Sequence, residues 1–285
     1  MVGGKLPERE KQMTDAKPLA VVTGASGGIG AAYARALAAR GYDLALVARR
    51  ADRLQLLADD LGSRHHVNCA VLTADLTRDA DRKVIEDYLA GATNLDLLVN
   101  NAGFGTMGRF FEASIESQDA MHRLHVMATM RLTHAALRNL TVRGRGAVIN
   151  VSSVAAFVPR PGSTSYYATK AWINCFTECL QLELQGAGSR VRMQALCPGF
   201  TLTEFHDVLG LDRKAIMAGA WWMPADDVVA ASLRGLEKGT LFVIPGWRYR
   251  LLVAVLRLLP RAALHFALTR GPAGLRRDRR TADQA

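Results

Sequence analysis

The chain has 285 residues, of which 49% are hydrophobic, and this length and composition fit one sizeable globular domain rather than two. Its net charge of +10 is uneven, because nine arginines against two aspartates from Arg248 onward contribute +7. A nearly balanced remainder argues against a nucleic-acid-binding protein. Four cysteines without CxxC or metal-ligand spacing predict no metal site, a reducing cytoplasmic location, and buried thiols at Cys175 and Cys179.

The chain begins with a polar, charged segment, 1–17, which lacks the apolar stretch of a secretory signal and is expected to be a flexible arm. The apolar run Leu19–Thr23 then predicts a strand, and the alanine-rich Ala31–Arg40 predicts a helix. The glycine turn between them would present backbone N–H groups and a helix N-terminus to a diphosphate. We expect cofactor contacts from Gly24, Ser26, Gly28, Ile29 and Gly30.

A second predicted strand, Tyr42–Val47, ends in Ala48, Arg49 and Arg50. Dinucleotide-binding folds that take NAD place an acidic residue about twenty positions after the glycines, where it binds the ribose 2′-OH. Here that carboxylate is missing and two guanidinium groups follow, which can bind a 2′-phosphate. The sequence therefore predicts NADP(H), with Arg49 as the main contact and Arg50 assisting.

The rest of the domain alternates between helical and strand patterns. Helices are predicted over Leu54–Leu61, Ala120–Leu140 and Tyr166–Leu184, and strands over Val67–Thr73, Leu95–Val99, Ala147–Val151, Val191–Leu196 and Leu241–Ile244. This alternation predicts an α/β fold, a single doubly wound Rossmann domain at 18–246 with a parallel sheet of about seven strands. A helical extension, 247–270, and a basic tail, 271–285, follow it.

Side chains suited to carbonyl chemistry come after the fifth strand. Ser152 and Ser153 stand at its end, where a hydroxyl can hold a substrate oxygen. Tyr166 and Lys170 lie one turn apart on a helix and share a face. An ammonium beside a phenol is expected to lower the phenol's pKa from about 10. Tyr166 could then act as general acid in reduction and as general base in oxidation.

Two motifs occur in the same order and separation as in a known family. Thr23-Gly24-x-x-x-Gly28-x-Gly30, together with Tyr166-x-x-x-Lys170 thirteen residues after Ser153, resembles the short-chain dehydrogenase/reductase family over 18–246. The resemblance implies that Ser153, not Ser152, is catalytic and that Lys170 also binds the nicotinamide ribose. It implies a homodimer or homotetramer through the helices that contain Leu124 and Phe176.

The same resemblance implies further cofactor contacts. They are Asp75, Leu76, Asn101, Ala102, Gly103, Pro198, Gly199, Phe200, Thr201 and Thr203, in addition to Tyr166 and Lys170. Asp75 would hydrogen-bond the adenine, or it could cap the following helix. Asparagine amides at a strand end can satisfy neighbouring backbone groups, while Gly103 lets the cofactor approach.

His125 departs from the family pattern, in which an asparagine binds a water that links the catalytic lysine to solvent. The histidine shares the expected inward face with Met121 and Ala128. An imidazole both donates and accepts, so His125 could carry this proton relay as a catalytic residue. It could equally be a substitution satisfied by a structural hydrogen bond.

Large apolar side chains gather in loops beyond the strands, where this fold places its substrate. The expected pocket residues are Phe104, Phe157, Phe205, Trp221 and Trp222. We therefore expect an NADP(H)-dependent carbonyl reductase or alcohol dehydrogenase acting on a lipophilic, bulky ketone, aldehyde or alcohol. The alternatives are an NADP-sensing binding protein and a membrane-associated reductase of lipid metabolism.

The extension Trp247–Arg270 predicts an amphipathic helical element interrupted at Pro260. Arg250, Arg257 and Arg261 recur on one side, and leucines and valines occupy the other. It could cover the substrate pocket, pack on a partner subunit or lie on an anionic membrane. Burial against protein is the expectation, and membrane contact is not favoured.

Overall fold

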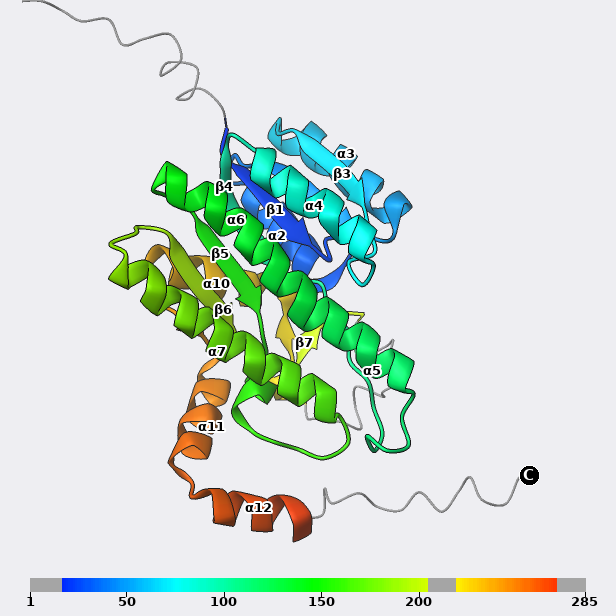
Figure 1. The fold of residues 1–285 in the computed structure, drawn as a ribbon, viewed down its shortest axis with the longest axis vertical. Helices are drawn as coiled ribbons and strands as arrows, with labels where there is room; N and C mark the ends of the chain where they lie inside the picture. Colours follow the sequence, from blue (N-terminus) through cyan, green and yellow to red (C-terminus); the bar gives the residue numbers. More distant parts are fainter. Residues whose placement is uncertain (1–16, 205–218, 271–285) are drawn as a thin grey trace, which may run out of the picture.

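A computed structural model of the chain describes residues 17–204 and 219–270. Seven strands form one parallel sheet in the order β3-β2-β1-β4-β5-β6-β9 (Figure 1). They are β1 (Leu19–Thr23), β2 (Asp43–Ala48), β3 (Cys69–Thr73), β4 (Leu95–Asn100), β5 (Ala147–Val151), β6 (Arg192–Leu196) and β9 (Phe242–Val243). This confirms the predicted doubly wound sheet. The strand order reverses between β1 and β4, the switch point at which such sheets bind their ligands.

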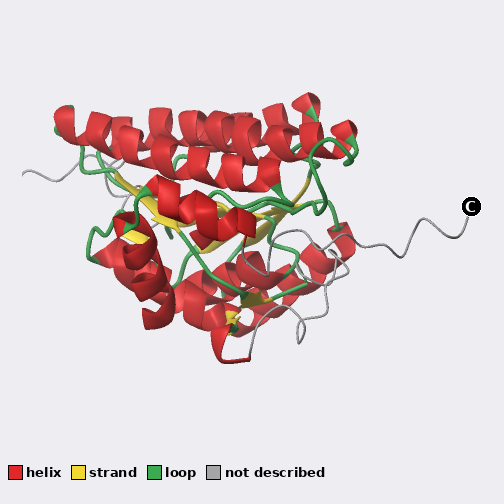
Figure 2. Cartoon of the chain, turned by 90° about the horizontal axis from the view of Figure 1, so that it is seen from below, coloured by secondary structure: helices red, strands yellow, loops and turns green. Residues whose placement is uncertain are grey.

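Helices cover both faces of the sheet (Figure 2). One face carries α2 (Gly28–Ala38), α3 (Ala51–His65) and α10 (Ala225–Glu237), and the other carries α4 (Asp79–Gly91), α6 (Thr129–Arg143) and α7 (Thr164–Gly186). Successive strand side chains point to opposite faces, so Ala20 and Val22 join the first core and Leu19 and Val21 the second. Burial on both faces explains why these strands are continuous apolar runs.

The long helix predicted over 120–140 is divided into three parts. It consists of α5 (Ile115–His122), a π-helical turn η1 (Arg123–Ala128) and α6. Met121, Ala128 and Leu132 are buried, as their spacing predicted. A π turn inserts an extra residue into the helix, which an apolar repeat does not reveal. His125 lies inside this turn and is 1% exposed.

Other differences lie at short elements. A two-stranded sheet, β7 (Thr201–Leu202) with β8 (Met223–Pro224), was not predicted, and short 3₁₀ turns occur at η2 (Val154–Phe157) and η3 (Gly219–Trp221). The predicted burial of Cys175 and Cys179 is wrong for the single chain. Both are exposed, because they lie on the side of α7 that faces away from the sheet.

The C-terminal extension forms α11 (Trp247–Leu258) and α12 (Arg261–Arg270), which lie at the opposite end of the molecule from α3 (Figure 1). The break at Pro260 is as predicted, and Leu259 before it has the extended backbone that proline imposes. One side of α11 is buried through Tyr249 and Val253, while Leu251 and Leu258 are exposed. Within 17–204 and 219–270, no helix has the length and apolar character to cross a membrane.

Candidate active site

The turn between β1 and α2 has the geometry expected of a phosphate-binding loop. Gly24 and Gly28 have φ of +66° and +54°, which L side chains rarely adopt. A Cβ at Gly30 would stand 2.2 Å from the carbonyl oxygen of Gly24, so only glycine allows α2 to pack this closely on the turn. Gly27 is the N-cap residue of α2, so no side chain caps the first N–H groups of the helix, and the first turn contains no acidic residue. Its N–H groups can therefore bind an anion.

The end of β4 is tied to this turn through one hydroxyl and one amide. Thr23 Oγ1 accepts hydrogen bonds from the backbone N–H groups of Asn101 (2.9 Å) and Ala102 (3.0 Å). The side-chain amide of Asn101 donates to the carbonyl oxygen of Thr23 at 2.8 Å. Asn101 thus satisfies backbone groups, as its place at a strand end predicted. Its position beside Gly24 brings the β4 end against the phosphate turn.

The two arginines after β2 have different surroundings. Arg50 donates to Ser26 Oγ at 3.0 and 3.1 Å and pairs with Glu204 at 2.9 Å, and Arg53 pairs with the same carboxylate at 2.6 Å. Arg49 is exposed at the strand end. Glu204 was not recognised from the sequence, because no motif connects it with arginines about 150 positions earlier.

Asp75 does not cap the next helix, so that alternative is wrong. The N-cap position of α4 is Arg78, and Asp75 Oδ1 instead accepts from the backbone N–H (3.0 Å) and hydroxyl (2.8 Å) of Thr77. Desolvation raises the pKa of Asp75, but the hydrogen bonds from Thr77 and the charges of Arg49 and Arg78 outweigh it and hold the pKa below its usual value. Asp75 is therefore an anionic acceptor near Arg49, and Leu76 beside it is buried.

The catalytic candidates meet at the end of β5. Ser153 follows the strand, and its Oγ accepts a hydrogen bond from Ala155 N–H at 3.1 Å. The same hydroxyl is hydrogen-bonded with the phenol of Tyr166. Lys170, on the same face of α7, has its Nζ 5.8 Å from the centroid of the Tyr166 ring. Ser152 is buried and donates to the carbonyl oxygen of Lys170 at 3.0 Å, so Ser153 is the serine beside the tyrosine.

The pKa of the phenol differs from the expectation. Burial raises the pKa of Tyr166 to about 12, although the hydrogen bond with Ser153 lowers it. The ammonium of Lys170 donates to the carbonyl oxygen of Val151 at 2.8 Å, and burial lowers the pKa of Lys170 to about 8. The predicted lowering of the Tyr166 pKa is therefore wrong for the chain alone, because desolvation of the buried phenol outweighs the lowering by the Ser153 hydrogen bond.

His125 connects the β4 end with α7. Its Nε2 accepts a hydrogen bond from the backbone N–H of Phe104 at 3.2 Å, and its Nδ1 lies 2.9 Å from the hydroxyl oxygen of Thr169. That hydroxyl donates to the carbonyl oxygen of Tyr166 at 3.1 Å, so the ring donates from Nδ1. Burial and the charge of Lys170 hold the pKa of His125 well below its usual value, and the ring is neutral.

Both ring nitrogens of His125 therefore have partners within the chain. This arrangement is the structural hydrogen-bonding alternative that the sequence left open for this position. A Cβ at Gly103 would come within 2.8 Å of His125 Nε2, so the histidine also explains why a glycine stands there. The proton relay stays a prediction.

The loop after β6 is fixed to the serine. The backbone N–H of Val154 donates to the carbonyl oxygen of Pro198 at 3.0 Å, and Thr201 is buried where β7 begins. Gly28 approaches Thr203, since a Cβ at Gly28 would lie 3.1 Å from the Thr203 side chain. The loop thus runs from the serine to the glycine turn, and it brings together the two motifs.

The expected pocket residues that the structure describes form two groups. Phe104 and Trp222 contact His125 and Phe200, whereas Phe157 and Trp221 contact residues of α11. Trp222 lies against Phe200 with ring centroids 5.2 Å apart, and Phe104 lies 6.1 Å from His125. Phe157 contacts Phe242 at 6.4 Å, with the guanidinium of Arg257 4.7 Å above its ring. Trp221 packs edge-on against Tyr249 at 5.2 Å. Phe205 lies outside the described residues.

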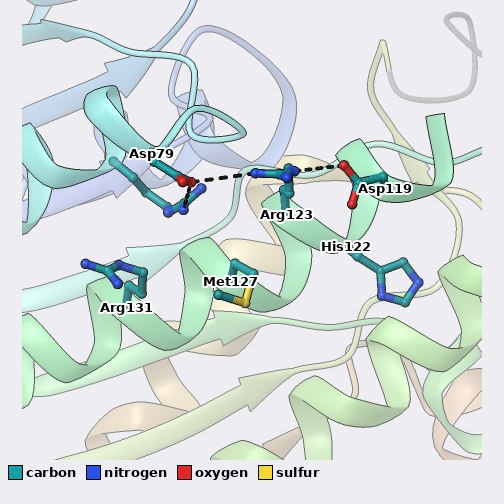
Figure 3. Close-up of a pocket in the computed structure, with 7 residues that line it drawn as sticks. Asp79, Asp119, His122, Arg123, Met127 and Arg131 are labelled. Carbon is teal, nitrogen blue, oxygen red and sulfur yellow. Dashed lines mark hydrogen bonds and ion pairs between the residues drawn. The ribbon is translucent and has the colours of Figure 1, made fainter. Parts of the chain in front are cut away.

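Two hollows lie away from this cluster. One of about 360 Å³ separates α4 from α5 and η1, and it is lined by Asp79, Arg82, Asp119, His122, Arg123, Met127 and Arg131 (Figure 3). Arg123 there pairs with Asp119 at 2.8 Å and Arg131 with Glu86 at 2.5 Å, so these cations are already neutralised. A larger hollow of about 810 Å³ lies between α6 and α7. Neither is lined by Ser153, Tyr166 or Lys170.

The amino-acid sequence of this chain is similar to those of known proteins. The family model described as short chain dehydrogenase covers residues 18–214. A short chain dehydrogenase of Pseudocercospora fijiensis is 37% identical over 204 residues, which are 70% of this chain and 64% of that protein.

Two of the solved structures that resemble this chain are similar to it in both fold and sequence. A short-chain dehydrogenase from Sphingobium yanoikuyae in complex with NADPH is 34% identical, covering 94% of this chain and all of that one, with a TM-score of 0.77. The bulky-bulky ketone specific alcohol dehydrogenase from Comamonas testosteroni is 32% identical, covering 92% and 96%, with a TM-score of 0.73. With the glycine turn, the serine and the tyrosine–lysine pair in place, the chain is an oxidoreductase that belongs to the short-chain dehydrogenase family.

Proposed function

We propose that the protein is an NADP(H)-dependent oxidoreductase that interconverts a lipophilic ketone or aldehyde and its alcohol. The observation that carries this proposal is the hydrogen-bonded pair Ser153–Tyr166, with Lys170 beside it, at the strand edge that also holds the glycine turn. The family relation and the alcohol dehydrogenase among the similar structures support the same class of reaction.

The residues of the turn fit the proposed cofactor. The uncapped N-terminus of α2 and the backbone of Gly24 and Gly28 would hold its diphosphate, and the loop around Gly199 would meet its nicotinamide end. NADP(H) supplies or accepts the hydride. Ser153 would hold the substrate oxygen, and the Tyr166 hydroxyl would give or take the proton at that oxygen.

The proposed roles of Lys170 and His125 are supported by their hydrogen bonds. Lys170 is anchored at Val151 and would bind the ribose beside the nicotinamide while placing a positive charge near the phenol. His125 is proposed as a positioning residue, because it joins Phe104 to the helix turn that carries Tyr166. It acts on the reaction through these groups rather than by contact with the reacting atoms.

NADP(H) is proposed over NAD(H) because the end of β2 offers cations and no carboxylate. Arg49 is exposed there, and Arg50 lies across the glycine turn. The similar Sphingobium yanoikuyae structure is described as a complex with NADPH. Glu204 engages Arg50 and Arg53 but not Arg49 in the described contacts, which leaves Arg49 as the proposed main partner of a 2′-phosphate.

A lipophilic, bulky substrate is proposed from the aromatic rings near the loops that follow β4 and β6. Phe104, Trp221 and Trp222 lie beside the loops that flank Ser153 and Tyr166, and the Comamonas testosteroni relative is described as specific for bulky-bulky ketones. A homodimer or homotetramer is also proposed, through the continuous η1–α6 helix that contains Leu124 and through α7, which contains Phe176.

The test is a screen of purified protein against ketones and aldehydes of increasing size, following NADPH absorbance. We expect turnover with aryl or long-chain ketones and none in Tyr166→Phe, which keeps the ring and loses the acidic hydroxyl. NADPH binding without turnover of any carbonyl compound would instead support an NADP-sensing protein.

A further inference from the structure

Tyr249 connects the C-terminal extension with the loop that follows β6. The side chain comes from the first turn of α11, and it is 3% exposed. Its ring lies directly over Gly199, where an added Cβ would be 2.0 Å from Tyr249 Cζ. The backbone of Gly199 is outside the positive-φ region, so the ring above it, and not the local conformation, requires a glycine.

The phenol of Tyr249 makes two hydrogen bonds that join separate segments. Its oxygen accepts from the backbone N–H of Phe200 at 2.9 Å and donates to the carbonyl oxygen of Trp221 at 2.7 Å. Phe200 directly precedes β7 and Trp221 comes two residues before β8, and the two segments are also joined here by the bond from Met223 N–H to the carbonyl oxygen of Phe200 at 3.0 Å. The hydroxyl of Tyr249 thus fixes the loop after β6 against the segment that contains Trp221.

A second contact lies two turns further along α11. The guanidinium of Arg257 is 4.7 Å from the centroid of Phe157 and 5.9 Å from that of Phe242. Phe157 ends the 3₁₀ turn that begins directly after Ser153. The helix α11 therefore contacts the segment after β5, which contains Ser153, and the loop after β6.

We propose that Tyr249 is a positioning residue of the active site, whose hydroxyl fixes the Gly199–Phe200 segment against Trp221 and makes α11 part of the cofactor and substrate site. The inference rests on the proposed role of this loop at the nicotinamide end of the cofactor. Without the hydroxyl, the Phe200 N–H and the Trp221 carbonyl each lose a partner, and the loop is free to depart from the geometry that the cofactor requires.

Tyr249→Phe in the full chain tests this directly, because the ring stays over Gly199 and only the hydroxyl is lost. We expect kcat/KM for NADPH to fall by about fivefold to tenfold, because both hydrogen bonds of the hydroxyl are lost and the loop is no longer held in place. Hydrogen–deuterium exchange should rise over residues 198–203 while the β1 strand stays protected. Val253→Ala is the matched control, since Val253 is 2% exposed on the same side of α11. It should lower the melting temperature without changing the kinetics.

A second pair of variants uses the contact with Gly199. Gly199→Ala should weaken NADPH binding strongly in the wild-type background and little in Tyr249→Ala, where the ring that the new methyl meets is gone. Direct NADPH titration by fluorescence gives this readout even if no carbonyl substrate is found, so a failure of the proposed reaction is distinguishable. Unchanged kinetics and exchange in Tyr249→Phe, equal kinetic losses in Val253→Ala, or an equal Gly199→Ala effect in both backgrounds would overturn the proposal.

Discussion

Arg49 and Arg50 stand next to each other but have different partners, and this difference determines what each can contribute to cofactor binding. Arg50 is held by Ser26 and Glu204, whereas Arg49 is exposed and acts on Asp75 through its charge. A guanidinium that is already paired gains less from a phosphate than one that is not. The contacts around each arginine therefore determine which of the two can bind the 2′-phosphate of the proposed cofactor.

Cofactor preference should depend on Arg49. Arg49→Ala should weaken NADPH at least about tenfold and leave NADH nearly unchanged, because only the first cofactor has a charged group to lose. Isothermal titration with both cofactors measures this. Arg53→Ala is a control that removes a nearby cation paired with Glu204. Equal losses for NADPH and NADH would assign Arg49 a different role.

His125 should tolerate an amide better than an apolar side chain. His125→Asn should keep most turnover, since it retains a donor and an acceptor for Phe104 and Thr169. His125→Leu should lose at least about tenfold in kcat, because the Phe104 N–H and the Thr169 hydroxyl lose their common partner beside Tyr166. Steady-state kinetics of the two folded variants test this prediction. A His125→Leu enzyme with wild-type kinetics would exclude both the positioning role and the relay.

Lys170 should make stability depend on pH. Its pKa is about 8 in the folded chain against 10.5 ordinarily, so between these values the unfolded state binds more protons and stability rises with pH. The effect is on the order of 3 kcal/mol from pH 8 to 10.5. Urea unfolding at pH 7, 8, 9 and 10 should show the wild type gaining stability relative to Lys170→Met. A difference that stays constant with pH would argue against a buried, destabilised ammonium.

At the scale of elements, the site depends on where strands end and helices begin. The β1–turn–α2 unit, the β5–η2 connection and the start of α7 each place one part of the chemistry, and parallel pairing brings their ends to one edge. The π turn η1 places His125 beside them, and α11 packs over the loop after β6. The burial of the outer side of α11 against a partner stays a prediction.

The glycines of the turn should differ sharply in their tolerance to substitution. Gly30→Ala places a Cβ 2.2 Å from the Gly24 carbonyl oxygen, so α2 must move, and we expect destabilisation of at least about 1–3 kcal/mol with loss of NADPH binding. Gly27→Ala is the matched control, because its Cβ would meet the flexible side-chain ends of Arg50 at 3.2 Å and Glu204 at 3.6 Å and no backbone atom among its three nearest neighbours. Thermal melts with and without NADPH compare them. Equal behaviour of the two variants would mean that the close helix packing is unimportant.

At the scale of the molecule, one side of the chain has features of a subunit interface. The outer side of α7 exposes Cys175 and Cys179 and stacks Trp172 on Phe176 at 4.6 Å. The hollow of about 810 Å³ beside it is lined in part by Phe176 and Leu180. Aromatic and apolar side chains that gather on the outer side of a long helix are typical of a surface that a second subunit covers.

A change on this surface should alter the oligomeric state. Phe176→Asp should shift the protein to monomer in light scattering, since a charge cannot be desolvated in an apolar interface. Leu56→Asp on α3 is the control, because Leu56 is 72% exposed on the opposite side of the sheet. An unchanged mass for Phe176→Asp would place the interface elsewhere.

The amino-acid sequence by itself determined the parallel sheet, the glycine turn and the serine, tyrosine and lysine of the site. These depend on short-range patterns: apolar runs for buried strands, glycines for a backbone that no other residue fits, and one helical turn between Tyr166 and Lys170. For the same reason, the break at Pro260 was predictable, since proline acts on its own neighbours.

Only the tertiary structure decided what those residues meet. The pairing of Arg50 with Glu204, of His125 with Thr169, and of Tyr249 with Phe200 and Trp221 joins segments far apart in the chain, which no local pattern encodes. Burial likewise reversed the expected direction of the Tyr166 pKa, because desolvation depends on everything that packs around the phenol and not on the spacing of its neighbours.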